Sequence, residues 1–335
     1  MVCEKKVVEE VSGWLRVYDD GSVDRTWTGP PEVKFISDPV PSHEEFVDGV
    51  ATRDVTIDEK SGLRVRIYLP EVDSKEQNKL PIILHFHGGG FCISQADWFM
   101  YYTIYTKLVK MAKAICVSVY LRRAPEHRLP AACDDGLAAL LWLRSLAQGK
   151  SHESWLNDHA DFKRVFLIGD SSGGNLVHEV AARAGREDLS PVRIAGGIPI
   201  HPGFVRSERS KSELEKPQSP LLTLDMVDKF LGFALPVGCN KDHPLTCPMG
   251  PAAPPLNTLN LPPFLLCVAE DDLIRDTEME YYEAMKRANK DVILLTNPGM
   301  GHSFYLNKIA MDMDPQTASQ ATALFEGIVE FINKH

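Results

Sequence analysis

The sequence predicts an α/β fold built on a mainly parallel β-sheet with helices on its faces. Unbroken apolar runs recur along the chain, and runs without alternation are typical of strands that are buried on both faces of a sheet. Segments with helical spacing separate several of these runs, and this alternation of strand and helix is the pattern of a parallel sheet. The runs are residues 82–86, 115–119, 165–168, 194–200, 264–268 and 292–295.

The N-terminal region is expected to hold a helix, a short hairpin and a loop. Apolar residues over 5–17 recur at helical spacing, which predicts a helix with one apolar face. Asp20 and Gly21 then mark the tight turn of a hairpin. Residues 28–50 are rich in proline and acidic residues and show no period, so we expect a loop there.

Two antiparallel strands are expected before the first apolar run. Residues 51–58 and 62–70 alternate between apolar and polar side chains. In the second segment Val65 and Ile67 share one face, while Arg66 lies on the other. This alternation predicts two strands that are half exposed.

Helices are expected over residues 131–147, 174–185 and 277–288, where apolar side chains follow helical spacing. Residues 203–255 interrupt the alternation of strand and helix, because they contain a charged run, several prolines and one amphipathic piece at 224–235. We therefore expect an insertion that covers one edge of the sheet.

Length and charge restrict the class of protein. The chain has 335 residues, which suit one large domain or two ordinary ones, and it carries a formal net charge of −10. The hydrophobic fraction of 44% and the charged fraction of 24% are typical of a globular protein. The acidic balance argues against nucleic acid or an anionic membrane as the main partner, because both bind basic surfaces.

The cysteines and the N-terminus bear on the compartment. The seven cysteines form no CxxC pair, and Cys92, Cys116 and Cys267 lie in or beside apolar runs, as core residues do. A reducing compartment is therefore expected. The first twenty residues hold no apolar core of a secretory signal, and no apolar stretch is long enough to span a membrane. These observations favour a cytoplasmic or nuclear location and leave monomer and homodimer open.

The strongest chemical motif is Gly-Asp-Ser-Ser-Gly-Gly-Asn at 169–175, which contains G-x-S-x-G. It follows the apolar run at 165–168 and precedes the helix expected at 174–185. A nucleophile elbow needs this strand–turn–helix context, so Ser171 is the candidate nucleophile. The amides at the start of the helix would stabilise a developing oxyanion. The alternative is an ordinary glycine–serine turn.

A second motif, His87 followed by three glycines, comes directly after the run at 82–86. Three consecutive glycines are costly in chain entropy, and they suit a loop whose backbone amides must lie bare against a substrate. The motif matches the oxyanion loop that accompanies G-x-S-x-G in esterases. A phosphate-binding loop is the alternative, but it would require lysine and serine or threonine where Phe91 and Cys92 stand.

Acidic residues and a histidine then follow in the order that such hydrolases use. His302 comes after the run at 292–295, and several acids come after the run at 264–268. A carboxylate and His302 could therefore meet above Ser171, with the histidine as base. Spacing alone does not select among the acids, and an acid that begins a helix is often a cap. The acids are Glu270, Asp271, Asp272 and Asp276.

Five motifs together resemble the plant carboxylesterase family, which belongs with the hormone-sensitive-lipase-like α/β-hydrolases. They are HFHGGGF at 85–91, APEHRLPAA at 124–132, GDSSGGN at 169–175, EDDLIRD at 270–276 and PGMGHSF at 298–304. The resemblance implies an α/β-hydrolase fold with a mostly parallel eight-stranded sheet. It also implies a helical cap formed by an N-terminal segment (1–50) and the insertion at about 203–255, on a core at 51–335.

The resemblance also implies roles for individual residues. Ser171, Asp272 and His302 would be the catalytic nucleophile, acid and base. The oxyanion would be bound by the amides of Gly88, Gly89 and Ser172, where the family usually has alanine at the last position. Substrate binding is assigned to Gly90, Phe91 and Asp170.

Before the APEH motif the family usually has Tyr-Arg-Leu, whereas this chain has Leu121, Arg122 and Arg123, so the arginine at position 122 is retained. Arg122 is expected to form a structural ion-pair network with Glu126 and with Asp134 or Asp135. The sequence offers no role for the neighbouring Arg123.

No cofactor or metal is expected. His85 and His87 lie two residues apart on one strand, but no third ligand has a suitable spacing. The chain also contains neither a G-x-G-x-x-G nor a Walker A motif.

The leading hypothesis is a serine carboxylesterase that hydrolyses a small-molecule ester through an acyl-enzyme. One alternative is a dehydratase or cyclase on the same scaffold, as some relatives of the resembled family are. Another is a hormone-binding, receptor-like protein, since the gibberellin receptors also resemble this family. They lack the catalytic histidine, whereas this chain has His302.

Overall fold

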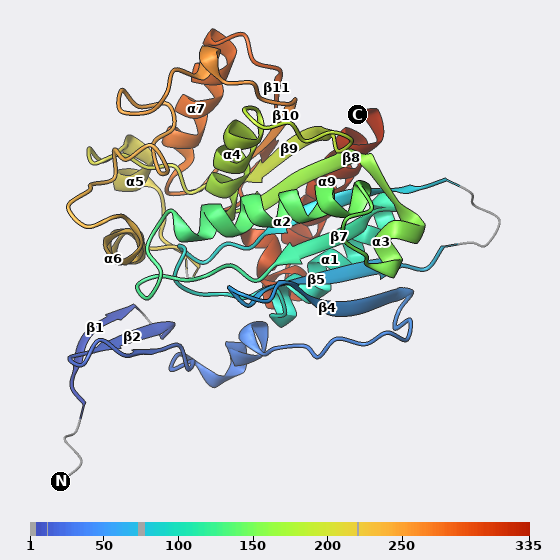
Figure 1. Ribbon diagram of the computed structural model, residues 1–335. Helices are drawn as coiled ribbons and strands as arrows, with labels where there is room; N and C mark the ends of the chain where they lie inside the picture. Colours follow the sequence, from blue (N-terminus) through green and yellow to red (C-terminus); the bar gives the residue numbers. More distant parts are fainter. Residues whose placement is uncertain (1–4, 12, 73–77, 220) are drawn as a thin grey trace.

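The computed structural model describes residues 5–11, 13–72, 78–219 and 221–335 (Figure 1). Its centre is an eight-stranded sheet with the order β11-β10-β9-β8-β6-β7-β5-β4. β4 and β5 run antiparallel to their neighbours and the other pairs are parallel, which confirms the predicted mostly parallel sheet. The strands are β4 (Val50–Asp58), β5 (Leu63–Pro70), β6 (Leu80–Phe86), β7 (Ile115–Val119), β8 (Ala160–Asp170), β9 (Ile194–Ile200), β10 (Phe264–Ala269) and β11 (Val292–Asn297).

Helices cover both faces of this sheet. α2 (Ala131–Ala147), α4 (Ser172–Ala184) and α7 (Arg275–Arg287) correspond to the three predicted helices, with ends shifted by at most two residues. α1 (Phe99–Ala112) and α9 (Pro315–Lys334) pack against each other and against other strands. The short helices are η1 (Pro31–Ser37), α3 (Ser154–His159), α5 (Lys211–Glu215), η2 (Leu256–Thr258), η3 (Phe304–Leu306) and α8 (Lys308–Met313).

The N-terminal segment is a small antiparallel sheet, so the helix predicted over residues 5–17 is wrong. A left-handed turn at Gly13, with φ of +76°, separates the first two strands. Val7 and Val8 are adjacent, at the point where the pairing with the second strand is irregular, so the valines do not alternate as in a simple strand and resemble helical spacing. The hairpin turn predicted at Asp20 and Gly21 is present. The strands are β1 (Val7–Val11), β2 (Leu15–Tyr18) and β3 (Val23–Asp24).

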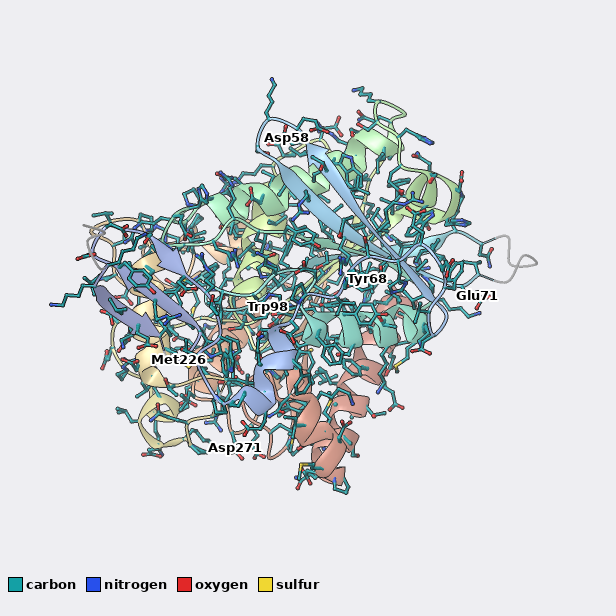
Figure 2. The ribbon with its side chains drawn as sticks, turned by 90° about the horizontal axis from the view of Figure 1, so that it is seen from below. Asp58, Tyr68, Glu71, Trp98, Met226 and Asp271 are labelled. Atoms are coloured by element: carbon teal, nitrogen blue, oxygen red, sulfur yellow. The ribbon has the colours of Figure 1, made fainter. Side chains whose placement is uncertain are left out.

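This N-terminal sheet is held against the body of the protein by aromatic stacking. The ring of Trp14 stacks on Trp98 with centroids 6.0 Å apart and meets the edge of Trp27 at 4.4 Å. Figure 2 views the molecule from this side, where the blue N-terminal strands and η1 flank Trp98. The expected helical cap is therefore, in its N-terminal part, a sheet and a 3₁₀ helix.

The insertion contributes α6 (Leu224–Ala234), which confirms the amphipathic piece predicted at 224–235. Thr223 caps this helix by accepting a hydrogen bond from the Met226 amide. Lys229 on α6 donates to the Glu10 carbonyl of β1 at 2.8 Å, so insertion and N-terminal sheet meet. Together they lie over the ends of the central strands. The insertion was expected to cover one edge of the sheet, and this expectation is wrong.

The strand β5 is more buried than its alternating pattern indicated. Arg66 is only 1% exposed, because loop residues before β4 cover it. Its guanidinium makes two bonds to Asp54, at 2.8 and 2.7 Å, and a third to the Val40 carbonyl. A buried charge requires such complete pairing, and here the loop supplies part of it.

The predicted network around Arg122 is present in part. Its backbone amide and side chain donate to Asp135 at 2.7 and 2.8 Å. Glu126 instead accepts two bonds from Arg25 of the N-terminal segment. Arg123 is largely buried and donates to the Ser94 carbonyl at 3.5 Å. Burial, and then the nearby Arg25 charge, lower the pKa of Arg123 to about 10.

The structure also bears on the cysteines and on membrane spans. Cys92, Cys116 and Cys267 are buried, as predicted for core residues. Among the helices of the described residues, none combines the length and the apolar character needed to cross a bilayer.

Candidate active site

Three parallel strands of the sheet bring the candidate catalytic residues together. Ser171 follows β8, Asp272 follows β10 and His302 follows β11. Because these strands are parallel, their carboxyl ends lie at the same edge of the sheet, which is where α/β proteins place their sites.

Ser171 occupies a strained turn between β8 and α4. Its φ is +50° and its ψ is −121°, a conformation that residues with a β-carbon rarely adopt. Gly173 permits this turn, because a β-carbon there would lie 2.0 Å from the Phe86 carbonyl oxygen. The strain and the close approach are those of a nucleophile elbow, in which the serine projects from the turn.

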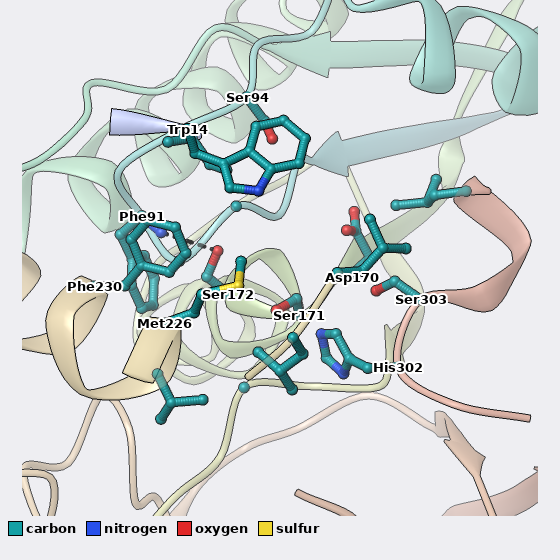
Figure 3. Close-up of a pocket in the computed structure, with 18 of the residues that line it drawn as sticks. Trp14, Phe91, Ser94, Asp170, Ser171, Ser172, Met226, Phe230, His302 and Ser303 are labelled. Carbon is teal, nitrogen blue, oxygen red and sulfur yellow. Dashed lines mark hydrogen bonds between the residues drawn. The ribbon is translucent and has the colours of Figure 1, made fainter. Parts of the chain in front are cut away.

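His302 is held by Asp272 and lies beside Ser171 (Figure 3). Its Nδ1 lies 2.6 Å from Asp272 Oδ2. A carboxylate only accepts, so Nδ1 donates and Nε2 remains as the acceptor of the neutral imidazole. Asp272 is fully buried, and its second oxygen accepts from the Ile274 amide at 3.1 Å.

The other acids after β10 have different partners, which the sequence could not reveal. Asp272 is the one whose carboxylate reaches His302 within the described residues. The remaining partners are the Gly299 amide for Glu270, Lys216 for Asp271 and the Arg275 side chain for Asp276.

In the glycine loop after β6, one backbone amide is hydrogen-bonded within the described part of the protein and two are not. The Gly88 amide donates to the Tyr101 hydroxyl at 2.9 Å and to Asp170 Oδ1 at 3.2 Å, so it is engaged inside the protein. Gly89 and Gly90 line the pocket. No acceptor for either of these two amides exists in the part of the chain that the structure describes. The open donors are thus displaced by one residue from the expected pair, Gly88 and Gly89.

A mostly apolar pocket surrounds Ser171. Its empty volume is about 810 Å³, open mouth included. Walls come from three separate segments: Trp14 from the N-terminal sheet, Phe230 from α6 and Met100 from α1. Gly90, Phe91 and Asp170, which were assigned to substrate binding, also line it. Among the described lining residues there is no lysine or arginine, so the pocket offers no cationic partner.

A second imidazole, His201, lies beside His302. Its Nδ1 accepts from the Ser303 amide at 3.0 Å, and this bond fixes the loop that carries His302. Burial lowers the pKa of His201 to about 4, so the ring is neutral. His201, Asp272 and His302 bring ligand atoms within 4.8 Å of one another. His302 Nδ1 and His201 Nδ1 are engaged by Asp272 and by the Ser303 amide, whereas His201 Nε2 has no partner among the described residues. The bond between His302 and Asp272 is the one that acid–base chemistry requires.

A profile of proteins with the alpha/beta hydrolase fold matches residues 83–306, from β6 to the end of η3. The chain belongs to this family.

Known relatives of this α/β-hydrolase include enzymes of more than one class. A probable carboxylesterase of Arabidopsis thaliana is 38% identical over 305 residues, covering 90% of this chain and 85% of the relative. A 2-hydroxyisoflavanone dehydratase of Glycyrrhiza echinata is 36% identical over 312 residues, covering 90% and 91%. The solved esterase of Pyrobaculum calidifontis has a TM-score of 0.68 and 25% identity, covering 84% of each chain. These matches place the α/β-hydrolase among the plant carboxylesterases and their relatives.

Sequence reasoning missed several residues around the site of this α/β-hydrolase. The hydroxyl of Tyr101 accepts a hydrogen bond from the Gly88 amide of the glycine loop. Trp14 was placed on a helix. Neither position carries a local motif, because both reach the site only through tertiary packing.

Glu278 on α7 is a buried acid that bonds to neither His302 nor Ser171 among the described residues. It is fully buried, and neither carboxylate oxygen has a hydrogen-bond partner among the described residues. Burial, and then the negative charge of Asp272, raise the pKa of Glu278 well above its usual value of 4.5. The side chain is therefore neutral in the folded protein at pH values where it ionises in the unfolded chain.

Replacing Glu278 by glutamine is expected to remove a pH-dependent loss of stability. An acid with a raised pKa binds its proton more tightly when folded, so stability falls as pH rises above about 4.5. The free energy of unfolding of Glu278→Gln minus that of the wild type should grow by up to about 1.4 kcal/mol per pH unit. Urea unfolding at several pH values above 4.5 measures this, and a constant difference would contradict it. The exposed Glu283→Gln serves as control.

Proposed function

We propose that this protein is a serine esterase in which Ser171 is the nucleophile, His302 the base and Asp272 the orienting acid. The observation that carries the proposal is the 2.6 Å bond from His302 Nδ1 to buried Asp272, with the ring beside Ser171 at the strained turn. This arrangement supplies the nucleophile, the base and the group that orients the base.

In the proposed reaction Ser171 Oγ attacks the ester carbonyl carbon while its proton moves to His302 Nε2. The tetrahedral intermediate collapses, the bond to the alcohol oxygen breaks, and the alcohol leaves with the proton from His302. A water molecule then gives a proton to His302 and attacks the acyl-enzyme. The acid is released and Ser171 recovers its proton.

The oxyanion is assigned to the amides of Gly89, Gly90 and Ser172. Two of these are unengaged amides of the glycine loop, and the third begins α4, where helix amides have no intrahelical partner. Each such donor stabilises the transition state by about 3 kcal/mol in comparable sites. Gly88, included in the expected set, instead anchors the loop.

The proposed substrate is a neutral ester with an apolar body. The pocket wall is dominated by aromatic and aliphatic side chains, and Asp170 is the acidic group on it. A carboxylate on the substrate would be buried beside Asp170 with no cation among the described lining residues. An unpaired buried charge is strongly unfavourable.

We therefore expect p-nitrophenyl butyrate to be hydrolysed with a kcat/KM about 100-fold above that of mono-p-nitrophenyl succinate, which adds a carboxylate at similar length. Release of p-nitrophenol, corrected for spontaneous hydrolysis, measures both substrates. Comparable values of kcat/KM would rule out a neutral-ester pocket.

The experiment that tests the proposed chemistry is covalent labelling. The protein is incubated with a small alkyl fluorophosphonate and its intact mass is recorded beside that of Ser171→Ala. A single adduct on the wild type, absent from the variant, supports an activated Ser171. A folded wild type that forms no adduct would contradict the esterase assignment.

A dehydratase is the second candidate, favoured by the similarity to 2-hydroxyisoflavanone dehydratase. In that case His302 would transfer a proton of a bound substrate, and no acyl group would reach Ser171. Such an activity would survive Ser171→Ala, whereas ester hydrolysis would not.

A further inference from the structure

The glycine loop is attached to the rest of the site at both of its ends. At the first end Gly88 binds inward, and at the second end Phe91 does the same. The unengaged amides of Gly89 and Gly90 lie between these two attachments. Their orientation therefore depends on the groups that hold the ends.

Tyr101 and Asp170 form the first attachment. The Tyr101 hydroxyl accepts from the Gly88 amide at 2.9 Å and donates to Asp170 Oδ2 at 3.2 Å. Asp170 Oδ1 accepts from the same amide at 3.2 Å, so three hydrogen bonds connect Gly88, Tyr101 and Asp170 in a closed cycle. Gly88 must be glycine for this approach, because a β-carbon would lie 2.3 Å from Asp170 Oδ2.

This first attachment joins three elements. Gly88 follows β6, Tyr101 lies on α1, and Asp170 ends β8 directly before the nucleophile. Tyr101 is 1% exposed and Asp170 3%. Packing therefore fixes both side chains. Through them the position of the glycine loop is tied to Asp170, the residue next to Ser171.

The Ser172 hydroxyl forms the second attachment. The Phe91 amide donates to Ser172 Oγ at 3.1 Å, the dashed contact in Figure 3. Phe91 has a left-handed φ of +63°, so the chain turns back at this point. An alanine at position 172 would keep the backbone amide and lose this bond. Ser172 thus touches both sides of the oxyanion site, through its amide and through its hydroxyl.

We propose that Tyr101, Asp170 and the Ser172 side chain are positioning residues that hold the oxyanion loop at a fixed distance from Ser171. The inference rests on the proposed esterase function. Donors that are already aligned need no rearrangement when charge develops on the substrate oxygen. Loosening them should therefore weaken binding of the transition state and leave ground-state binding nearly unchanged.

Ser172→Ala and Tyr101→Phe test this proposal, since each removes one hydroxyl and keeps the remaining shape. We expect kcat to fall about 10- to 100-fold in each variant and KM to change less than about threefold. Tyr105→Phe is the matched control. Tyr105 is also buried on α1, and its hydroxyl makes no hydrogen bond to the loop among the described residues. Its kcat should match that of the wild type.

A second readout separates positioning from a general loss of structure. A trifluoromethyl ketone forms a reversible hemiketal with a nucleophilic serine and places an oxyanion in the site. Its inhibition constant should rise in proportion to the loss of kcat/KM in Ser172→Ala and Tyr101→Phe. Thermal unfolding midpoints, measured in parallel, verify that the variants remain folded.

The outcomes are distinguishable. A wild type that neither hydrolyses esters nor reacts with the fluorophosphonate would defeat the proposed function, and the positioning role with it. An active wild type whose two variants keep kcat within twofold would overturn the positioning role alone. A loss of kcat without a matching rise in the inhibition constant would also overturn it.

Discussion

Replacing Ser171 by alanine is expected to lower kcat for ester hydrolysis by about 10⁴-fold or more, because the acyl-enzyme can no longer form. Alanine keeps a β-carbon at the φ of +50°, so the strained turn and the fold should persist. Initial rates at saturating p-nitrophenyl butyrate measure the loss, and circular dichroism verifies the fold.

The control for this prediction is Ser207→Ala, which alters an exposed serine of the insertion and should retain the wild-type rate. Residual hydrolysis by Ser171→Ala within tenfold of the wild type would remove the serine from the mechanism. Retained turnover of a β-hydroxy ketone to its enone would then favour the dehydratase.

Replacing Asp272 by asparagine is expected to lower kcat by about 10³- to 10⁴-fold with little change in KM. The amide nitrogen of asparagine is a donor, and it would turn His302 Nδ1 into the acceptor. His302 Nε2 would then carry the proton and could not take another from Ser171. Steady-state kinetics from pH 6 to 9 measure the effect.

Asp271→Asn is a closely matched control for Asp272→Asn. Asp271 is the adjacent residue, but it pairs with Lys216 at 2.7 Å on a partly exposed surface. An exposed ion pair contributes little, so this variant should keep kcat within about twofold. Equal losses in the two variants would mean that Asp272 does not act through His302.

The elements that carry the chemistry could be predicted because their signals are local. The buried strands are continuous apolar runs, and the turn at 169–175 contains its own motif between strand and helix. The N-terminal sheet was misread for the opposite reason. A strand with a register shift and a glycine turn at Gly13 spaces its apolar residues much as a helix does.

The finer parts of the site depend on the direction in which side chains and backbone amides point. The spacing of residues in the sequence does not determine that direction. Four acids follow β10 within seven residues, and only the course of the backbone decides that Asp272 faces His302. In the same way, the three glycines look equivalent in the sequence. The packing of Tyr101 against Gly88 makes one an anchor and leaves the other two open to the pocket.

The division of the pocket between segments bears on how such a protein changes over evolution. The residues that would break the ester bond follow strands of the central sheet, whereas Trp14 and Phe230 come from segments outside it. Substitutions in these outer segments would reshape the cavity without moving Ser171 or His302. New substrate ranges are thus reachable through mutations that spare the reactive centre, and lineages that diverge in the substances they process can share one chemistry.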